Sequence, residues 1–518
     1  MRIIVATSLA LTFSTVMSAR ETPTWSRDVA PIIYRACVSC HHTGGIAPFP
    51  LTTFEEVMSM AQAVNEAVVT RTMPPYPADL TYRRYAHERA LSNDEITAIT
   101  EWVAMGTPAG DLTQAPPPPR FDDGPALKSP DLVVTMPRYT SKAANNDVYR
   151  CFTMPTNESV DRYIDAIEIV PGNSSIVHHV LVFIDTASTT AALDAQDQEP
   201  GYVGFGGVGS TTAELAAVWA PGATPTVFPS GFGIRLPKRA RVIFQMHYPA
   251  GTQGETDATS IRLRYATHPA VRPVMISAVL NHENIVNKPF RIPANQVKTF
   301  RQQYTVPADV SVLAVAPHMH LLGKSAKVWV RTPASDTIPI ISIPHWDFHW
   351  QIAYVFPTML RITKGSVLES QFTYDNTSLN EHNPSTPPAD VQRGESTTDE
   401  MMLTFFYYAL YRPGDENIRL DVALTPTSAS SDTDAGSSWS AMPNPTTGTA
   451  WIRGVRVQGQ QASIRVVDAM GRIVFTDTRD ALQDASVTIP VPGLTSGAYN
   501  VIVTDGPSMQ TIPLRVLK

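Results

Sequence analysis

Between residues 128 and 425 the chain consists of short runs rich in Val, Ile, Phe and Tyr, each interrupted by Pro, Gly or Asn. Proline removes a backbone donor and breaks helices, whereas β-branched and aromatic side chains favour strands. Short strands at this spacing predict antiparallel β-sandwiches. Because the stretch is too long for one sandwich of about 100 residues, we expect two, over residues 128–272 and 273–425. The chain is therefore predicted to be mainly β.

The segment before these strands has a helical pattern. Within residues 24–112, apolar residues share one face of an expected helix at four positions: Val57, Ala61, Val64 and Val68. A second helix is expected to begin at Ser92, because Glu95 three residues later completes a capping box. Residues 113–127 contain four consecutive prolines and predict a stiff linker.

Charge and apolar runs limit the function classes. Charged residues make up 17% of the 518 residues and the net charge is -7, so no basic surface for nucleic acid is indicated. Arg2 precedes an apolar run that ends in small residues and is too short to span a bilayer. It predicts a secretory signal peptide over residues 1–19. No later run is long enough for a transmembrane segment, so we expect an exported protein.

The run Cys-Val-Ser-Cys-His at residues 37–41 is the attachment motif for c-type haem. Cys37 and Cys40 would add to the porphyrin vinyl groups, and His41 would be the proximal iron ligand. Met73 precedes two prolines and would supply a thioether as the second axial ligand. The alternatives are a redox CxxC or half of a zinc site for the cysteines, and core packing for Met73.

Residues 24–112 resemble the small mono-haem cytochrome c modules that are fused to larger secreted bacterial proteins. Besides the CxxCH motif, the resemblance rests on Asp-Val-Ala-Pro-Ile at 28–32, Gly-Gly-Ile-Ala-Pro at 44–48 and Arg-Thr-Met-Pro-Pro at 71–75. It implies a covalent haem with His and Met ligation, which suits electron transfer better than oxygen binding.

Five histidines lie in three apolar runs of the expected sandwiches: His178, His179, His247, His318 and His320. A buried imidazole needs a polar partner, and one metal ion can serve several. His318 and His320 would point to the same face of a strand. His178 and His179 are adjacent and could share an ion only at a bulge or a strand end. Since imidazole suits zinc, copper, iron or nickel, these residues predict one or two sites of undecided metal.

Residues 130–412 resemble the copper type II, ascorbate-dependent monooxygenases, the family of peptidylglycine α-hydroxylating and dopamine β-monooxygenases. Its opening strands are matched from Met-Pro at 136–137 to the segment that ends at Cys151. The histidine and methionine segments are matched by four runs: Val-His-His-Val at 177–180, Gln-Met-His-Tyr at 245–248, His-x-His-x-x-Gly at 318–323 and the stretch from Gly394 to Met401.

The resemblance implies two tandem jelly-roll sandwiches, each holding one copper ion on its inner face. The copper that stores an electron would have three ligands: His178, His179 and His247. The copper at which oxygen reacts would have a softer set, which favours Cu(I): His318, His320 and Met401. This enzyme would hydroxylate a C–H bond of a small-molecule substrate with O2, using ascorbate or a redox protein as electron donor. Core packing is the alternative for Met401.

The chain departs from the family at several positions. Peptide-amidating members have Arg at the position of Ala316 and Asn at that of Leu403, so a peptide C-terminus is not the expected substrate. Animal members usually have Tyr at the position of Phe405. Their disulfides are missing, so Cys151 is expected to be a buried thiol or a site of intermolecular pairing. Four further histidines are expected to be structural, pocket-lining or loop residues: His282, His345, His349 and His382.

Residues 426–440 are polar and predict a flexible linker. Residues 441–518 alternate apolar and polar positions and predict a small β-sandwich. They resemble the sorting domain of the type IX secretion system in Asn-Pro-Thr-Thr-Gly at 444–448, Gly-Ala-Tyr at 497–499 and a basic last strand. The resemblance implies that the secretion machinery is a partner and that the protein is secreted or held at the cell surface. A generic adhesion-like sandwich is the alternative.

The combined prediction is an exported monooxygenase with two copper ions and a covalent haem that passes electrons from a donor to the coppers. Two other classes stay open. One is a copper-binding or copper-handling protein without turnover, and the other is a surface electron-transfer cytochrome carried on a β scaffold.

Overall fold

The computed structural model describes residues 21–421, except positions 120, 122–123, 205–206 and 269, together with Leu494 and the strands between 440 and 516. The predicted signal peptide, the polar linker up to residue 439 and the turn at 444–448 lie outside the described residues. The chain divides into two compact units, Met1–Ser428 and Ala429–Lys518. Within the described part, no helix is long and apolar enough to cross a membrane.

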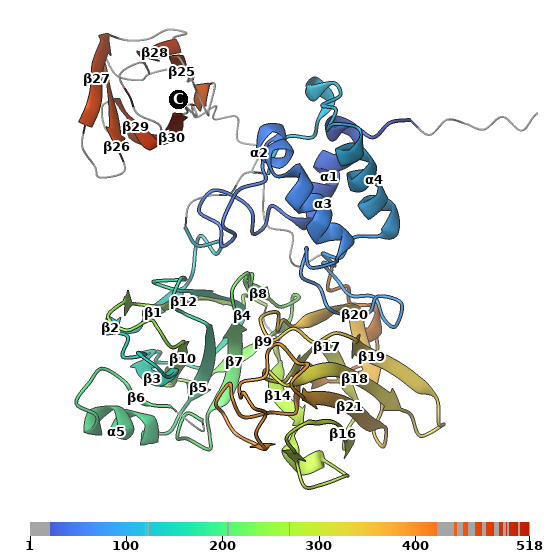
Figure 1. Ribbon diagram of the computed structural model, residues 1–518. Coiled ribbons are helices and arrows are strands. Elements are labelled where there is room, and N and C mark those ends of the chain that lie inside the picture. The colour runs from blue at the N-terminus through green and yellow to red at the C-terminus, as the bar shows by residue number, and fades with distance from the viewer. Residues whose placement is uncertain are drawn as a thin grey trace, which may run out of the picture. The chain divides into compact units, whose positions relative to one another are not determined.

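Unit 1 begins with helices that form their own core (Figure 1). They are η1 Trp25–Val29, α1 Ala30–Ala36, α2 Phe54–Ser59, α3 Ala61–Val69, α4 Asn93–Ala104 and η2 Leu112–Gln114. The expected apolar face, from Val57 to Val68, is buried, although Met60 divides it between α2 and α3. The capping box of Ser92 and Glu95 is present at the start of α4, as predicted.

The next part of unit 1 is a sandwich of two sheets. One sheet has the order β1-β12-β4-β9-β13 with β8 beside β4, and the other has the order β6-β3-β10-β5-β7. The first sheet contains β1 Leu132–Thr135, β4 Arg162–Val170, β8 Thr226–Val227, β9 Phe232–Leu236, β12 Ser260–Tyr265 and β13 Arg272–Pro273. The second contains β3 Val148–Pro155, β5 His179–Asp185, β6 Tyr202–Val203, β7 Glu214–Trp219 and β10 Arg241–Tyr248. Strands β2 Tyr139–Thr140 and β11 Thr256–Asp257 pair separately, and α5 spans Thr189–Gln196.

A second sandwich follows, with sheet orders β14-β23-β17-β20 and β16-β21-β18-β19. The first sheet contains β14 Met275–Leu280, β17 Val310–His318, β20 Tyr354–Ile362 and β23 Leu403–Leu410. The second contains β16 Gln296–Thr305, β18 Gly323–Arg331, β19 Thr337–Ile343 and β21 Val367–Asn376. Strands β15 Arg291–Ile292 and β22 Val391–Gln392 pair separately, and the short helices are η3 His282–Asn284 and η4 Asp415–Asn417.

The two sandwiches share one continuous cluster of buried apolar side chains. Among the named strands of the described residues, pairing is antiparallel apart from the short contact of β13 with β9. Strand β21 alternates buried and half-buried residues over its whole length, whereas β10 is buried at every position after Arg241. The prediction of a mainly β protein built from antiparallel sandwiches is confirmed.

The loop between α3 and α4 lies against the second sandwich (Figure 1). The backbone N–H of Asp79 donates to the carbonyl of Ser342 at 2.8 Å, and that of Ala86 donates to Val355 at 2.8 Å. The hydroxyl of Tyr85 donates to the carbonyl of Ile340, also at 2.8 Å. The helical part is therefore attached by a docked loop as well as by the proline-rich segment.

Unit 2 contains one sheet of order β24-β25-β28 and one of order β27-β26-β29-β30. The strands are β24 Ser440–Met442, β25 Thr449–Arg453, β26 Gln461–Asp468, β27 Ile473–Asp480, β28 Ser486–Pro490, β29 Gly497–Asp505 and β30 Ser508–Val516. Alternate residues of the central strands, Ile464, Val466 and Val501, are fully buried.

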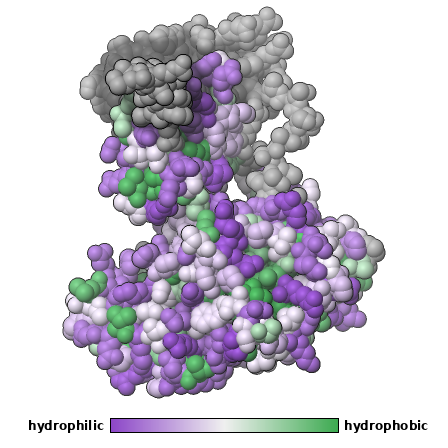
Figure 2. Space-filling model, turned by 90° about the vertical axis from the view of Figure 1, so that its right-hand side faces the viewer, coloured by the Kyte–Doolittle hydropathy of each residue, from purple (hydrophilic) through white to green (hydrophobic). Residues whose placement is uncertain are grey.

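On the face of unit 1 seen in Figure 2, apolar side chains are scattered among polar ones.

Candidate functional site

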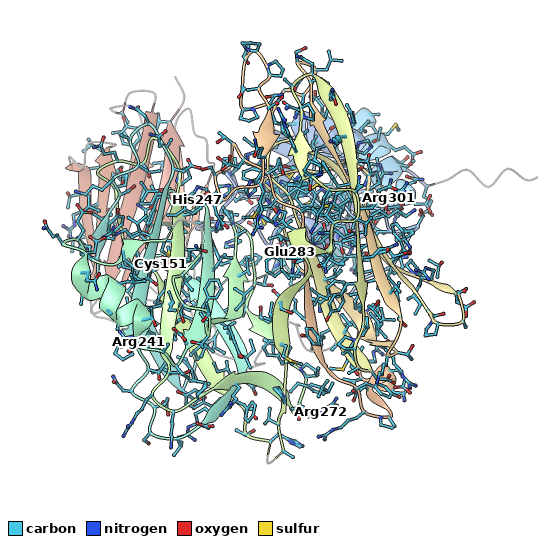
Figure 3. All side chains as sticks on the ribbon, turned by 90° about the horizontal axis from the view of Figure 1, so that it is seen from below. Cys151, Arg241, His247, Arg272, Glu283 and Arg301 are labelled. Atoms are coloured by element: carbon cyan, nitrogen blue, oxygen red, sulfur yellow. The ribbon has the colours of Figure 1, made fainter. Side chains whose placement is uncertain are left out.

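The first histidine cluster lies at the ends of two paired strands. Strand β5 begins at His179, which is directly opposite His247 of β10. His178 stands just before the strand, and its N–H donates to the carbonyl of His247 at 3.0 Å. Figure 3 shows His247 at the opposite end of β10 from Arg241. Because a strand end relaxes the alternation of side chains, the adjacent His178 and His179 can converge.

The ring nitrogens of this cluster face one another. One ligand atom each of His178, His179 and His247 lies within 4.8 Å of the other two. The Nδ1 atom of His179 is 3.3 Å from Nδ1 of His178 and 3.3 Å from Nδ1 of His247. Burial lowers the pKa of His178 to about 4 and that of His179 well below its usual value. Converging imidazole nitrogens fit a metal ion such as copper or zinc.

Asp147 orients the third member of the cluster. The Nε2 atom of His247 lies 2.9 Å from Oδ2 of Asp147, which leaves Nδ1 for a metal. This hydrogen bond is the main reason why the pKa of Asp147 falls to about 2. The Tyr149 ring stacks on His247 with centroids 4.4 Å apart. Asp147 also accepts a hydrogen bond from the Thr397 hydroxyl of the second sandwich at 3.1 Å.

The second cluster lies where β17 ends. His318 is the last residue of that strand, His320 follows it, and their ring centroids are 5.1 Å apart. The Nδ1 atom of His318 donates to Oε1 of Gln351 at 2.5 Å, and Nδ1 of His320 donates to the carbonyl of Asp399 at 3.1 Å. Burial lowers the pKa of His318 to about 3. Both rings are therefore neutral, with Nε2 left for a metal.

A buried carboxyl connects this cluster to Met401. Glu400 is fully buried and accepts backbone N–H bonds from His320, Leu322 and Met401 at 3.0, 2.7 and 3.1 Å. Burial raises its pKa to about 8. Met401 stands two residues before Leu403, which is opposite His318 in the β17–β23 pair. The chain thus brings Met401 to the strand end that carries His318.

The two clusters meet at the junction of the sandwiches. The Phe348 ring stacks on His178 with centroids 5.4 Å apart and meets His320 edge-on at 6.2 Å. The prediction that the histidines face the inside of each sandwich is wrong for His179 and His247. Their neighbours on β5 and β10, including Val180 and Met246, fill the shared core, so these histidines lie on the opposite face of the sheet.

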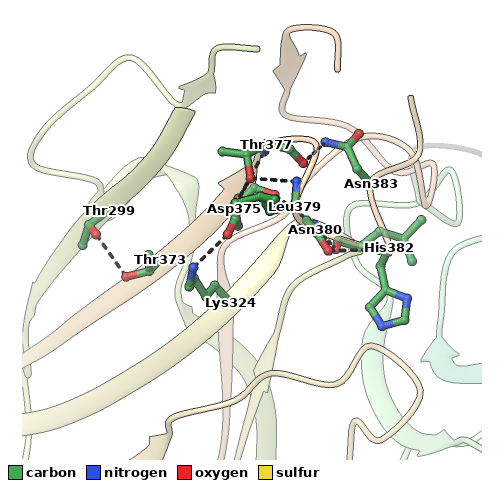
Figure 4. Close-up of polar contacts among 10 residues, drawn as sticks. Thr299, Lys324, Thr373, Asp375, Thr377, Leu379, Asn380, His382 and Asn383 are labelled. Carbon is green, nitrogen blue, oxygen red and sulfur yellow. Dashed lines mark hydrogen bonds and ion pairs between the residues drawn. The ribbon is translucent and has the colours of Figure 1, made fainter. Parts of the chain in front are cut away.

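Figure 4 shows polar contacts of the loop after β21, and Nδ2 of Asn380 in this loop donates to the carbonyl of Leu321, the residue after His320, at 3.3 Å. Lys324 pairs with Asp375 at 2.8 Å, and the Thr377 hydroxyl donates to the same carboxylate at 2.7 Å. The ring of His382 comes to 6.4 Å from that of His349. Both histidines are exposed. His382 was expected in a loop, whereas His349, expected to be structural or pocket-lining, lies 3.2 Å from Asp347.

The CxxCH segment forms one helical turn at the end of α1. The N–H groups of Cys40 and His41 donate to the carbonyl of Cys37 at 3.1 and 3.0 Å. The Nδ1 atom of His41 lies 3.0 Å from the carbonyl of Phe49, which leaves Nε2 for an axial bond. Both cysteines are free thiols, and the Met73 side chain is 39% exposed. The turn presents two thiols and Nε2 of His41, the groups that covalent haem attachment requires.

Comparison with known proteins identifies two segments. Residues 278–430 match the family described as copper type II ascorbate-dependent monooxygenase, C-terminal domain. The predicted resemblance to this family is confirmed. Residues 440–514 match the secretion system C-terminal sorting domain, which supports the predicted tail and export of the protein.

One curated relative is a tyramine beta-hydroxylase of Caenorhabditis briggsae, 22% identical over 258 residues. The match covers 46% of this chain and 41% of the relative, so the chain spans less than half of that protein. Among solved structures, a beta-glucuronidase of Faecalibacterium prausnitzii is 12% identical with TM-score 0.13, covering 43% of this chain and 38% of its own. One from Ruminococcus gnavus is 11% identical with TM-score 0.14, covering 47% and 45%. Such TM-scores carry no argument about function.

The sequence did not predict the residues that support the two histidine clusters. Asp147, Gln351 and Glu400 are remote in sequence from the rings or backbone that they bind, and carboxylates and amides are usually exposed. His282 was expected in a loop. It lies in η3, where its Nε2 accepts the N–H of Met402 at 3.1 Å. No local pattern marks any of these contacts.

Proposed function

We propose that this protein is an exported copper-dependent monooxygenase that hydroxylates a C–H bond with O2, with electrons supplied through a fused c-type haem. The observation that carries the proposal is the convergence of His178, His179 and His247 opposite a second histidine pair at the same junction. Two separate imidazole sites suit hydroxylation with O2, because one site can store the second electron that the reaction at the other site requires.

Each proposed ligand has a partner that fixes its orientation. Bound copper would supply one-electron redox chemistry and a binding place for O2. Asp147 holds His247 with Nδ1 directed at its neighbours. Gln351 and the Asp399 carbonyl hold His318 and His320 with Nε2 free. Glu400 accepts the backbone N–H groups of both His320 and Met401, so one buried group holds the backbone at these two proposed ligands.

The helical part supplies the proposed electron entry. Cys37 and Cys40 would hold the haem covalently, with His41 and Met73 as axial ligands. The carbonyl of Phe49 fixes the His41 ring, so that its Nε2 faces away from the backbone. The docked loop between α3 and α4 keeps this part on the second sandwich. Export, supported by the sorting tail, suits covalent haem attachment.

The proposed substrate class is a small molecule without a carboxylate anchor. Ala316 and Phe405 face each other across β17 and β23, and Leu403 is opposite His318. These apolar side chains offer no partner for a carboxylate. A relative named for tyramine hydroxylation makes an arylalkylamine the first candidate.

The test is the metal content and oxygen uptake of the full chain, produced with haem maturation and loaded anaerobically with Cu(I). We expect about two copper ions per haem, and about one after the double change His318→Ala and Met401→Ala. Uptake of O2 should require both copper and an arylalkylamine, and a glycine-ending peptide should not replace the amine. Binding of zinc in place of copper, or of no metal besides iron, would contradict the proposal.

A further inference from the structure

Trp350 lies near the haem-attachment segment. The position that a Cβ atom on Gly222 would occupy is 3.6 Å from Sγ of Cys40 and 3.7 Å from Cζ3 of the Trp350 ring. Gly222 has a φ of 82°, a conformation that other residues rarely adopt. Since glycine has no side chain, the Cys40 thiol and the Trp350 ring both approach the same backbone.

The neighbours of Trp350 touch both histidine clusters. Gln351 accepts the Nδ1 hydrogen bond of His318 at 2.5 Å. The Gln351 amide also donates to the carbonyl of Phe348 at 2.9 Å, and this bond fixes the turn. The Phe348 ring contacts His178 and His320 at centroid distances of 5.4 and 6.2 Å.

We propose that Phe348, Trp350 and Gln351 form the contact path by which electrons pass from the Cys40 side of the haem site to both histidine clusters. Electronic coupling falls off less through bonded and packed atoms than through solvent, and these three residues lie within four consecutive positions of the chain. The path carries one electron at a time. For each electron, one haem iron goes from ferrous to ferric and one Cu(II) goes to Cu(I), without transfer of atoms. The inference rests on the proposed haem and copper sites and adds the residues that connect them.

The path explains why one short segment has contacts in three directions. Trp350 extends toward the cysteine, Gln351 toward the second cluster and Phe348 toward both clusters. The intervening His349 is exposed, its ring Nδ1 lies 3.2 Å from Oδ1 of Asp347, and its ring meets the Phe348 ring edge-on with centroids 5.7 Å apart, as a side branch of the path. His349 therefore provides a matched control within the same segment.

The test uses the full chain with haem attached and Cu(II) loaded. A photoexcited flavin reduces the haem in a laser flash, and the haem absorbance reports its reoxidation. Trp350→Leu is expected to slow reoxidation about tenfold, while the haem potential, the copper content and the Cu(II) electron paramagnetic resonance spectrum stay as in the unmodified protein. Trp350→Phe keeps an aromatic ring, so its haem reoxidation is expected to slow less than that of Trp350→Leu. His349→Ala is expected to reoxidise at the unmodified rate.

Equal rates for Trp350→Leu and the unmodified protein would overturn the path, as would an equal slowing in His349→Ala. If the unmodified haem is not reoxidised although both metals are bound, the path and the haem-fed electron supply both fail. Copper-dependent hydroxylation with ascorbate would then show that the monooxygenase part of the proposed function stands without them.

Discussion

Asp147 accepts a hydrogen bond from Nε2 of His247 at 2.9 Å and another from the Thr397 hydroxyl of the second sandwich at 3.1 Å. A single carboxylate therefore orients a proposed copper ligand and joins the two sandwiches next to it. Its low pKa, near 2, keeps it charged at neutral pH.

Replacing Asp147 by Ala should weaken copper binding at the first cluster. The His247 ring would lose the partner that fixes its tautomer and orientation, so affinity should fall by about 10- to 100-fold. Competition between the full chain and a Cu(I) chelator measures this change. Asp161→Ala is the control, because Asp161 pairs with Arg235 on the exposed surface of the same sandwich. Unchanged affinity in Asp147→Ala would show that the ring is held by its stacking on Tyr149 instead.

The histidine clusters could be predicted because their spacing and the strand pattern are local in the sequence. The capping box at Ser92 is local in the same way, and the structure contains it. The supporting residues could not be predicted. Gln351 reaches His318 only because the turn fixed by its own bond to Phe348 folds back onto β17. That contact depends on tertiary packing, for which residue type and spacing give no signal.

The alternation of β10 marks the face of the sheet that carries the first cluster. Arg241, Gln245 and His247 share one face of the strand, and apolar residues such as Met246 occupy the other, which agrees with the outward placement of His247. The burial of that face does not follow from the pattern, and His247 is only 1% exposed. Beside His247, Thr397 of the second sandwich reaches Asp147 at 3.1 Å, a cover that only the assembled structure shows.

Replacing Asp415 by Asn should weaken the attachment between the two sandwiches. Its carboxylate accepts hydrogen bonds from both terminal nitrogens of Arg272, at 2.6 and 2.7 Å, and from the Ser311 hydroxyl at 2.6 Å. Arg272 belongs to β13, which pairs with β9 of the first sandwich, and Figure 3 shows it at the seam. Asp415→Asn leaves this guanidinium without its counter-charge, so unfolding of unit 1 should cost about 3–5 kcal/mol less in denaturant titrations.

The same pair predicts a pH dependence. Burial alone would raise the pKa of Asp415, but its hydrogen bonds from Arg272, Ser311 and Arg412 hold it at about 2. The stabilisation is therefore complete above the usual value near 3.8 and is lost as pH falls toward 2. The difference in free energy of unfolding between the unmodified protein and Asp415→Asn should therefore become smaller as the pH falls from 3.8 toward 2. Asp421→Asn, at an exposed pair with Arg419, should leave the stability nearly unchanged at any pH.

Tyr85→Phe should loosen the docked loop. The change removes the hydroxyl that donates to the carbonyl of Ile340 and leaves that buried acceptor without its partner, at a cost of about 1 kcal/mol. Amide hydrogen exchange should become faster in β19 and in residues 76–89, while the cores of both sandwiches keep their protection. Arg84→Ala removes only an exposed ion pair with Glu88 and should leave exchange unchanged. Equal exchange in all three proteins would mean that the backbone bonds of Asp79 and Ala86, with the bond from Arg83 to the carbonyl of Pro339, hold the loop without the Tyr85 hydroxyl.

Thiol counting distinguishes the two expectations for Cys151. Its side chain is fully buried, its pKa is raised to about 12 by burial, and its Sγ lies 2.3 Å from where a Cβ on Gly204 would be. The thiolate is the reactive form, so a folded, haem-loaded chain should not react with an alkylating reagent. Because haem would occupy two of the three cysteines, unfolding should expose one reactive thiol per chain, and unfolded protein made without haem maturation should expose three. A disulfide-linked dimer, or a thiol that reacts in the folded protein, would show instead that the pocket around Gly204 opens to solvent.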